Sequence, residues 1–176
     1  LGADPNGGNS GASYVMFGFN TGQVDFLGTN GDDTLTGNSS ANILIGGLGN
    51  DTLGGGAGKD RLAGGVGNDT YQVNRGGGKD VIAEHDSTAG NSDTLLYGAT
   101  INPLDLVLSR QVNDLRIALH GTTDSVTIDN WYADPTASQV ETIQAGNGQT
   151  LLSTQVDGLI QAMAQFSANN NGLTWD

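Results

Sequence analysis

A nine-residue repeat runs through residues 28–83 and constrains the fold of this chain more than any other feature. Written in nines, the segment reads GTNGDDTLT, GNSSANILI, GGLGNDTLG, GGAGKDRLA and GGVGNDTYQ. Rows three to five match the pattern G-G-x-G-x-D-x-U-x in full, where U is a large apolar residue. Row one has Thr29 at the second glycine, and row two departs at Asn38, Ser40 and Asn42. A sixth copy follows after a slip of two residues and reads Gly76-Gly77-Gly78-Lys79-Asp80-Val81-Ile82.

Each row predicts a turn followed by a short strand. The glycines permit positive φ in the turn, and the apolar residue two positions after the aspartate points inward. Two rows complete one turn of a coil, so alternate rows stack roughly 4.8 Å apart. The stacked inner residues are expected to be Leu35, Leu44, Leu53, Leu62, Tyr71 and Ile82. A flexible Gly-rich linker is the alternative, but a linker has no reason to repeat an aspartate in this phase.

The composition implies that such a coil needs help to fold. The chain has 29 glycines among 176 residues, and only 36% of its residues are hydrophobic. Ordering a glycine-rich backbone costs more conformational entropy than ordering other residues. Cysteine is absent from the sequence, so disulfides cannot stabilise the fold. A bound metal ion is the remaining common source of stability.

The repeats resemble the haemolysin-type, or RTX (repeats in toxin), calcium-binding repeats. The resemblance implies a parallel β-roll with calcium held between stacked turns by oxygens at about 2.3–2.6 Å. In that family the earlier turn supplies carbonyls from its first and third positions, and the later turn supplies carbonyls from its second and fourth. The aspartates of both turns complete a site of about six ligands.

Carried onto this chain, the resemblance implies four ligand sets and therefore about four calcium ions. The first set is Gly28, Asn30 and Asp33 with Gly47, Gly49 and Asp51. The second, which departs from the pattern at Ser40 and Asn42, is Gly37, Ser39 and Asn42 with Gly56, Gly58 and Asp60. The third is Gly46, Leu48 and Asp51 with Gly65, Gly67 and Asp69. The fourth, which spans the slip, is Gly55, Ala57 and Asp60 with Gly76, Gly78 and Asp80. A fifth set begins at Gly64, Val66 and Asp69, and its second half stays open between Glu84 and Asp93.

Residues 84–176 are expected to form a capping domain. Alternating apolar residues on either side of turns at 111–114 and 121–124 predict a meander of short antiparallel strands. This region resembles the domain that often follows RTX repeats in bacterial secreted proteins. The segments that carry the resemblance are Ser92–Leu95, Asp105–Leu106, Ser109–Arg110, Asn113–Leu115 and Asp124–Tyr132. A capping-box pattern at Thr154–Asp157 and apolar residues at helical spacing predict a helix near 154–168. The predicted fold is therefore all-β, a parallel β-roll capped by an antiparallel meander and a C-terminal helix.

Residues 1–27 are expected to be a separate N-terminal strand or linker. Gly11–Gly18 resembles the closing strand of an FG-GAP repeat, the blade unit of integrin-like β-propellers, which implies the tail of a propeller. The alternative is an edge strand that pairs with the first coil. The start of the sequence has no basic or long apolar segment, so it reads as a cut inside a longer protein rather than a signal peptide.

Charge and hydropathy exclude several partners. The net charge of −13 disfavours nucleic acid, and the sequence has no apolar run long enough to span a membrane. Acidic residues outnumber basic residues by two in 28–83 but by nine in 84–176. Most ligands contributed by the repeats must therefore be main-chain carbonyls.

No catalytic motif is present in the sequence. The chain lacks H-E-x-x-H and G-x-S-x-G, it has no cysteine, and His85 and His120 lie in polar, loop-like stretches. The expected function is therefore non-catalytic. The RTX resemblance implies a module that leaves a bacterial cell unfolded through a type I secretion apparatus, folds on calcium outside, and helps upstream domains of the same polypeptide to fold. The alternative is an adhesin or glycan-binding module at the cell surface, with Trp131, Tyr132 and Trp175 facing a sugar.

Overall fold

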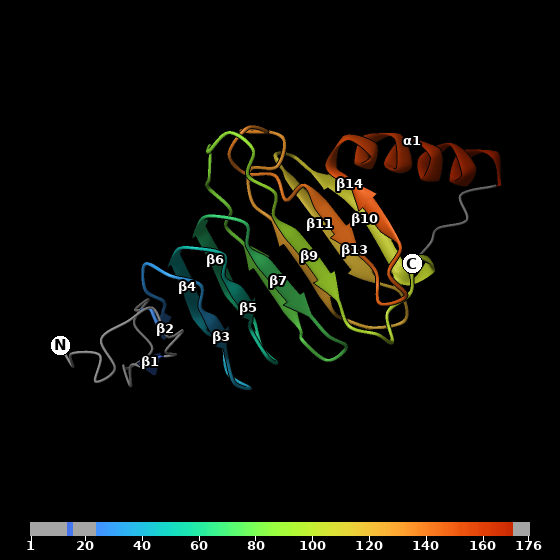
Figure 1. Ribbon diagram of the computed structural model, residues 1–176. Helices are drawn as coiled ribbons and strands as arrows, with labels where there is room; N and C mark the ends of the chain where they lie inside the picture. Colours follow the sequence, from blue (N-terminus) through green and yellow to red (C-terminus); the bar gives the residue numbers. More distant parts are fainter. Residues whose placement is uncertain (1–13, 16–23, 171–176) are drawn as a thin grey trace.

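Short strands alternate between two sheets, so the chain coils as a parallel β-solenoid (Figure 1). The computed structural model describes residues 14–15 and 24–170. The eight-stranded sheet contains, in spatial order, β1 (Tyr14–Val15), β2 (Phe26–Leu27), β4 (Ile43–Leu48), β6 (Arg61–Val66), β8 (Lys79–Ile82), β12 (Ser125–Ile128), β11 (Asp114–Leu119) and β10 (Leu106–Gln111). The six-stranded sheet contains β14 (Thr150–Leu152), β13 (Thr142–Gln144), β9 (Thr94–Tyr97), β7 (Thr70–Val73), β5 (Thr52–Gly54) and β3 (Thr34–Thr36).

The predicted inner ladder forms the core of the solenoid. One side chain from each of the five parallel strands stacks in register along the eight-stranded sheet, at Phe26, Leu44, Leu62, Ile82 and Ile128. The six-stranded sheet supplies the facing stack of Leu35, Leu53, Tyr71, Leu95 and Ile143. All six ladder residues expected from the repeat pattern are fully buried. Each fully buried leucine contributes about 1.5–3 kcal/mol relative to an exposed one, so the ladder is the main apolar contribution from the repeats.

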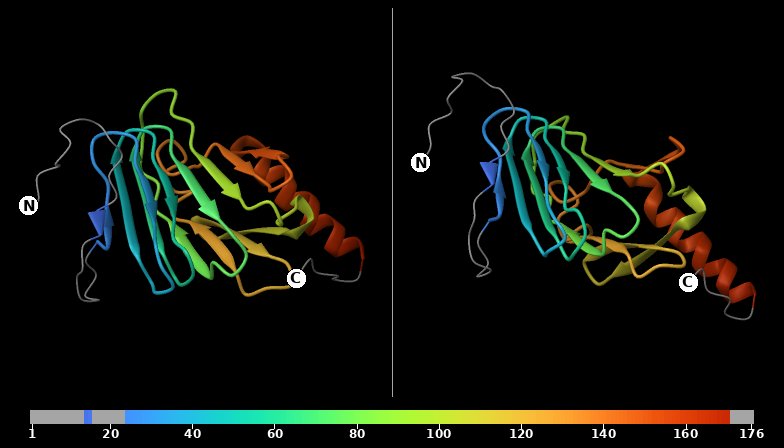
Figure 2. Two further views of the ribbon diagram at one scale, coloured as in Figure 1. Left: turned by 60° about the horizontal axis from the view of Figure 1, so that its bottom comes forward. Right: turned by 90° about the horizontal axis from the view of Figure 1, so that it is seen from below.

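Parallel stacking continues past residue 83, where the repeat pattern ends. β9 pairs in parallel with β7, β12 with β8, and β13 with β9, so the last rungs belong to the region expected to be a separate cap. Both sheets and the hydrophobic core cluster therefore run continuously across the expected boundary between residues 83 and 84. Figure 2 shows these rungs following the repeat rungs in one stack.

The expected antiparallel meander is present and terminates the eight-stranded sheet. β10 pairs antiparallel with β11, which pairs antiparallel with β12. A two-residue loop joins β10 to β11, with Val112 at φ 56°. A short 3₁₀ helix at Pro103–Asp105 precedes β10. β14 forms a second antiparallel pair with β13 at the end of the six-stranded sheet.

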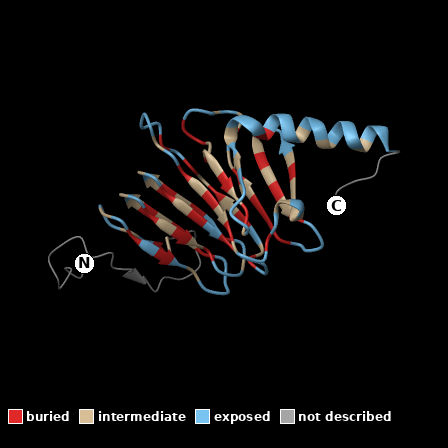
Figure 3. Ribbon diagram, turned by 45° about the vertical axis from the view of Figure 1, so that its right-hand side comes forward, coloured by how far each residue is buried: buried red, intermediate tan, exposed pale blue. Residues whose placement is uncertain are grey.

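The predicted C-terminal helix is α1, which spans Ser153–Asn169 and lies across the end of the stack (Figure 1). It starts one residue earlier than expected, because Gln155 Oε1 accepts the Leu152 N–H at 3.0 Å. Val156 is buried, whereas Leu159 and Phe166 are 38% and 45% exposed, so mainly the first turns of the helix pack against β10 and β14. In Figure 3 most of α1 has the pale blue colour of exposed residues.

Of the N-terminal segment that resembles an FG-GAP strand, only the backbone of Tyr14–Val15 lies within the described residues. This strand, β1, pairs antiparallel with β2. The remainder of that segment, and Trp175, lie outside the described residues.

Candidate metal sites

The aspartates of the repeats form two ladders of hydrogen bonds, one at each edge where the chain passes between the sheets. On one edge Asp51 Oδ1 accepts the Asp33 N–H at 2.8 Å, and Asp69 Oδ1 accepts the Asp51 N–H at 2.7 Å. On the other edge Asp60 Oδ1 accepts the Asn42 N–H at 2.8 Å, and Asp80 Oδ1 accepts the Asp60 N–H at 3.1 Å. Each bond joins one turn to the next, so the predicted partner rows lie directly on one another.

Four of the repeat aspartates each have one buried oxygen without a protein partner. Asp51 Oδ2, Asp60 Oδ2, Asp69 Oδ2 and Asp33 Oδ1 all lack a hydrogen bond within the described part of the chain. The four residues are at most 2% exposed. Buried polar atoms in proteins are nearly always satisfied, and an unpaired buried charge is costly. These oxygens therefore fit the ligands of a cation.

The glycines leave room for these oxygens. A Cβ on Gly46 would lie 2.2 Å from Asp51 Oδ2, and a Cβ on Gly64 would lie 2.0 Å from Asp69 Oδ2. Positive φ occurs at the second and fourth positions of rows three to six, at Gly47, Gly49, Gly56, Gly58, Gly65, Gly67, Gly76 and Gly78. These eight glycines are the residues of the later turns whose main-chain carbonyls are expected to bind calcium in the four ligand sets.

Burial also changes the acidity of the aspartates. It raises the pKa of Asp51 and of Asp60, and it raises the pKa of Asp69 and of Asp80 to about 6. The negative charge of other carboxylates adds to the effect of burial in each case, as that of Asp33 does for Asp51. In the absence of a cation, folding therefore works against ionisation of the residues that would bind it.

Rows one and two have a different turn from the later rows. Asp33 Oδ2 accepts the Thr29 N–H, and Asn42 Oδ1 accepts the Asn38 N–H at 2.8 Å. Neither Thr29 nor Asn38 has positive φ. Where Thr29 and Asn38 replace glycine, the side chains of Asp33 and Asn42 therefore bond within their own turns.

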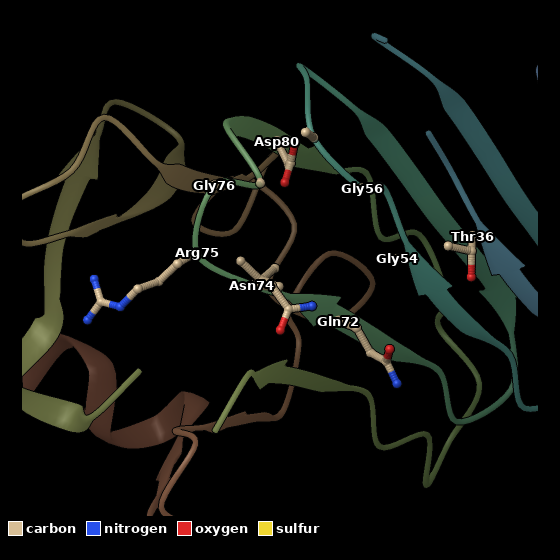
Figure 4. A pocket seen from close by; sticks show the side chains of 11 residues that line it. Thr36, Gly54, Gly56, Gln72, Asn74, Arg75, Gly76 and Asp80 are labelled. Atoms are coloured by element: carbon tan, nitrogen blue, oxygen red, sulfur yellow. The ribbon is translucent and has the colours of Figure 1, made fainter. Parts of the chain in front are cut away.

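The two-residue slip opens a cavity beside the sixth copy (Figure 4). The stacking register is kept, because Gly78 forms a parallel bridge to Gly58 twenty residues earlier. Val73 and Asn74 provide the additional length, and they line a cavity of about 300 Å³ together with Gly56 and Asp80. The sixth copy therefore keeps its register with the earlier turns despite the slip.

Carboxylates from the C-terminal region end both stacks, and the sequence did not indicate them. Inside the stack, the N–H of a fourth-position glycine donates to a carbonyl of the next turn, as from Gly49 to Val66 at 2.9 Å. In the last turns Gly67 N–H donates instead to Asp86 Oδ2 at 3.1 Å, and Gly78 N–H donates to Asp124 Oδ1 at 3.3 Å. Asp124 Oδ2 also accepts the Gly76 N–H at 2.7 Å. These side chains replace the missing next turn, and no repeat spacing identifies them.

Both residues between which the fifth set was left open, Glu84 and Asp93, lie beside Asp69 in the structure. Asp69, Glu84 and Asp93 are buried, and one carboxylate oxygen from each lies within 4.8 Å of the others. Burial and the charge of its neighbours raise the pKa of Glu84 to about 8 and of Asp93 to about 7.

The residues considered for other functions lie elsewhere. Trp131 is 1% exposed and packs in the core, so it does not face a sugar as the alternative, glycan-binding function would require. Tyr132 is half-buried beneath the Arg110 guanidinium, which lies 4.1 Å from the ring centre. His85 and His120 are both exposed. No helix in residues 24–170 is long and apolar enough to cross a membrane.

Comparison with known families agrees with this geometry. Residues 26–53 and 36–71 match the RTX calcium-binding nonapeptide repeat, and residues 114–153 match the haemolysin-type calcium binding protein related domain. The first match covers the stacked turns with the unpartnered aspartate oxygens. The second covers β11 to β14, which complete the last rung of the solenoid. The chain therefore carries RTX haemolysin-type calcium-binding repeats, followed by a haemolysin-type calcium-binding protein related domain.

Proposed function

We propose that this chain is a non-catalytic module that folds when it binds calcium outside the cell. The observation that carries the proposal is the group of buried, unpartnered oxygens on Asp51, Asp60 and Asp69. Without a cation, these carboxylates must be protonated or remain as unpaired buried charges, and either condition opposes folding at neutral pH. Calcium between the turns removes that opposition, so binding free energy becomes folding free energy.

The proposed ions occupy the four ligand sets derived from the repeats. Each set combines main-chain carbonyls with the aspartates, or with Asn42, of two stacked turns. Asp51 belongs to the first and third sets, and Asp60 belongs to the second and fourth. Each proposed ion therefore shares a carboxylate with the next ion on its edge, which couples the binding steps along the stack.

The proposed biological role is to couple export to folding. In the calcium-poor cytosol of a bacterium the chain would remain unfolded and pass through a type I secretion apparatus. Outside the cell, sites with a Kd of about 10⁻⁴–10⁻³ M would fill and fold the chain. The folded module would then support folding of upstream domains of the same secreted or surface polypeptide. Membership of the RTX repeats supports this role.

The proposal is tested by following secondary structure while calcium is varied. Circular dichroism of the purified chain in EDTA should show a largely disordered spectrum, and millimolar calcium should convert it to a β-rich one. Magnesium at the same concentration should not substitute, because it holds its water and requires tight octahedral geometry. An identical β-rich spectrum in EDTA would refute calcium-dependent folding.

A further inference from the structure

The stack ends on one edge in a cluster whose ligands differ from those of the repeats. The first position of the turn is Gly46 in row three and Gly64 in row five, and each glycine lies two residues after an inner leucine. In the next turn the residue two positions after the inner Ile82 is Glu84, so a glutamate replaces the glycine. Glu84 is 3% exposed. Its carboxylate therefore extends into the region where earlier turns have only a glycine and an aspartate oxygen.

A tyrosine holds this glutamate in place. Tyr71 replaces the leucine found at the matching position of earlier rows, and its hydroxyl donates to Glu84 Oε2. The same hydroxyl accepts the Gly64 N–H at 2.8 Å. Glu84 Oε1 accepts the His85 N–H at 2.8 Å. The glutamate is thus fixed by groups from its own turn and from the turn before it.

Asp93 is positioned from both sides of the stack. Its Oδ1 accepts the Asp69 N–H at 2.8 Å, and its Oδ2 accepts the Asn91 amide at 2.8 Å. Its own N–H donates to Glu141 Oε2 at 2.7 Å. Asp93 therefore continues the aspartate ladder of the repeats, and Glu141 continues it once more.

Two oxygens at the cluster have no donor among residues 24–170. Asp69 Oδ2 is fully buried and unpartnered, and so is the Oδ1 atom of Asn91, whose amide nitrogen contacts Asp93. Their lack of a partner is a separate observation from the closeness of the acidic residues, because buried polar atoms in proteins are nearly always paired. Two oxygens bound to one calcium at 2.3–2.6 Å lie at most about 5 Å apart, and the three carboxylates fall within 4.8 Å of one another.

We propose that Asp69, Glu84 and Asp93 bind one further calcium ion, which closes the stack and has carboxylates as its principal ligands. This inference rests on the proposed function, because Asp69 is also a ligand of the third repeat set. More carboxylates give a calcium site higher affinity. The terminal ion therefore binds more tightly than the ions between the repeats and fills first. Its position next to the last rungs makes it the starting point for folding of the repeats towards Gly28.

The test compares Glu84→Gln with Asp157→Asn. Glutamine keeps the size of Glu84 and an oxygen for the Tyr71 hydroxyl but removes the charge. Asp157 is exposed on α1, so its variant removes the same charge away from the cluster. Bound calcium is counted by equilibrium dialysis and metal analysis, and affinities are measured by calorimetric titration of the whole chain.

In the wild type and the Asp157→Asn control, the tightest ion should be present. In Glu84→Gln its affinity should fall by at least about tenfold, the effect that even outer-shell partners have on metal sites. The calcium concentration needed for folding should rise in parallel. In EDTA, by contrast, Glu84→Gln should retain more β-rich structure than the wild type, because the variant removes a buried carboxylate from beside Asp93 and Asp69. A purely structural role for Glu84 does not predict this change of sign.

The outcomes separate this inference from the proposed function. If the wild type binds no calcium, the proposed function and this site both fail. If the wild type binds calcium and Glu84→Gln binds the same number of ions with the same affinities, only the terminal site is overturned. Asp93→Asn gives a second variant of the same cluster, and it should lose the same ion.

Discussion

Replacing Asp51 with alanine should damage the solenoid about twice as much as replacing Asp33. Asp51 is 1% exposed, and its Oδ1 accepts the buried Asp33 N–H at 2.8 Å. Its Oδ2 has no partner and is a proposed ligand on the border of two ions. Asp33 lies in only one proposed set, and one of its oxygens bonds within its own turn to Thr29.

The expected magnitude follows from these contacts. Leaving the Asp33 N–H without an acceptor costs about 1–3 kcal/mol. Calcium at ten to one hundred times its Kd contributes about 1.4–2.7 kcal/mol for each ion. Loss of two ions and the hydrogen bond therefore destabilises the Asp51→Ala chain by about 4–8 kcal/mol. Asp33→Ala loses one ion and the hydrogen bond to Thr29, which contributes about 0.5–1.5 kcal/mol, so its cost is about 2–4 kcal/mol. The first value is comparable to the whole stability of a typical domain.

The assay is thermal unfolding in about 10 mM calcium, a concentration ten or more times the Kd expected for such sites, together with calorimetric ion counting. Asp51→Asn is the matched control, because the amide oxygen still accepts the Asp33 N–H while the charge is lost. This variant should melt between the wild type and Asp51→Ala. Equal ion counts and equal melting temperatures for Asp51→Ala and Asp33→Ala would refute the sharing of ligands between stacked ions.

Three further outcomes are expected. Deleting residues 133–176 removes the β13 rung and should raise the calcium concentration needed for folding, measured by circular dichroism, whereas deleting residues 1–27 should change it much less; equal midpoints would make the C-terminal rungs dispensable. Asp124→Ala leaves the N–H groups that end one stack without acceptors, so the calcium-loaded chain should lose about 1–3 kcal/mol in denaturant unfolding; unchanged stability would contradict its capping role. Burial raises the pKa of Glu84 from 4.5 to about 8, so the calcium-free fold should lose stability as pH rises across that range. Without calcium, the β-rich signal should therefore be stronger at about pH 5 than at about pH 8, and Glu84→Gln should reduce the difference.

The parts of the fold that follow a period could be predicted from the sequence. A nine-residue repeat places Leu35, Leu53 and Tyr71 on one face because two rows make one turn, and these residues are fully buried in register. The antiparallel strands on either side of residues 111–114 could also be predicted from the sequence, since alternation of apolar residues is a local signal.

The rungs beyond residue 83 could not be predicted because their spacing is irregular. Asp69 and Asp93 are 24 residues apart, and Asp93 and Glu141 are 48 apart, yet they continue the same ladder. An inserted hairpin and longer turns interrupt the period without breaking the parallel pairing of β9, β12 and β13. These strands extend the solenoid through the region expected to be a separate domain.

The acidic excess in residues 84–176 acquires a physical explanation from the same rungs. Glu84, Asp86, Asp93, Asp124 and Glu141 lie at the ends of the two turn stacks, where they accept main-chain N–H groups or join the terminal cluster. Counting acidic and basic residues showed that the excess lies in residues 84–176. The count could not assign these roles, because each role depends on which turn is the last in its stack.

Anomalous diffraction from crystals grown in calcium decides whether calcium lies between the stacked turns on the buried aspartate oxygens. This placement of calcium predicts peaks between Asp33 and Asp51, between Asn42 and Asp60, between Asp51 and Asp69, and between Asp60 and Asp80, each at about 2.3–2.6 Å from the oxygens that lack protein partners. A folded solenoid with no anomalous peaks at these positions would contradict it, particularly if water molecules or protein donors satisfied the same oxygens.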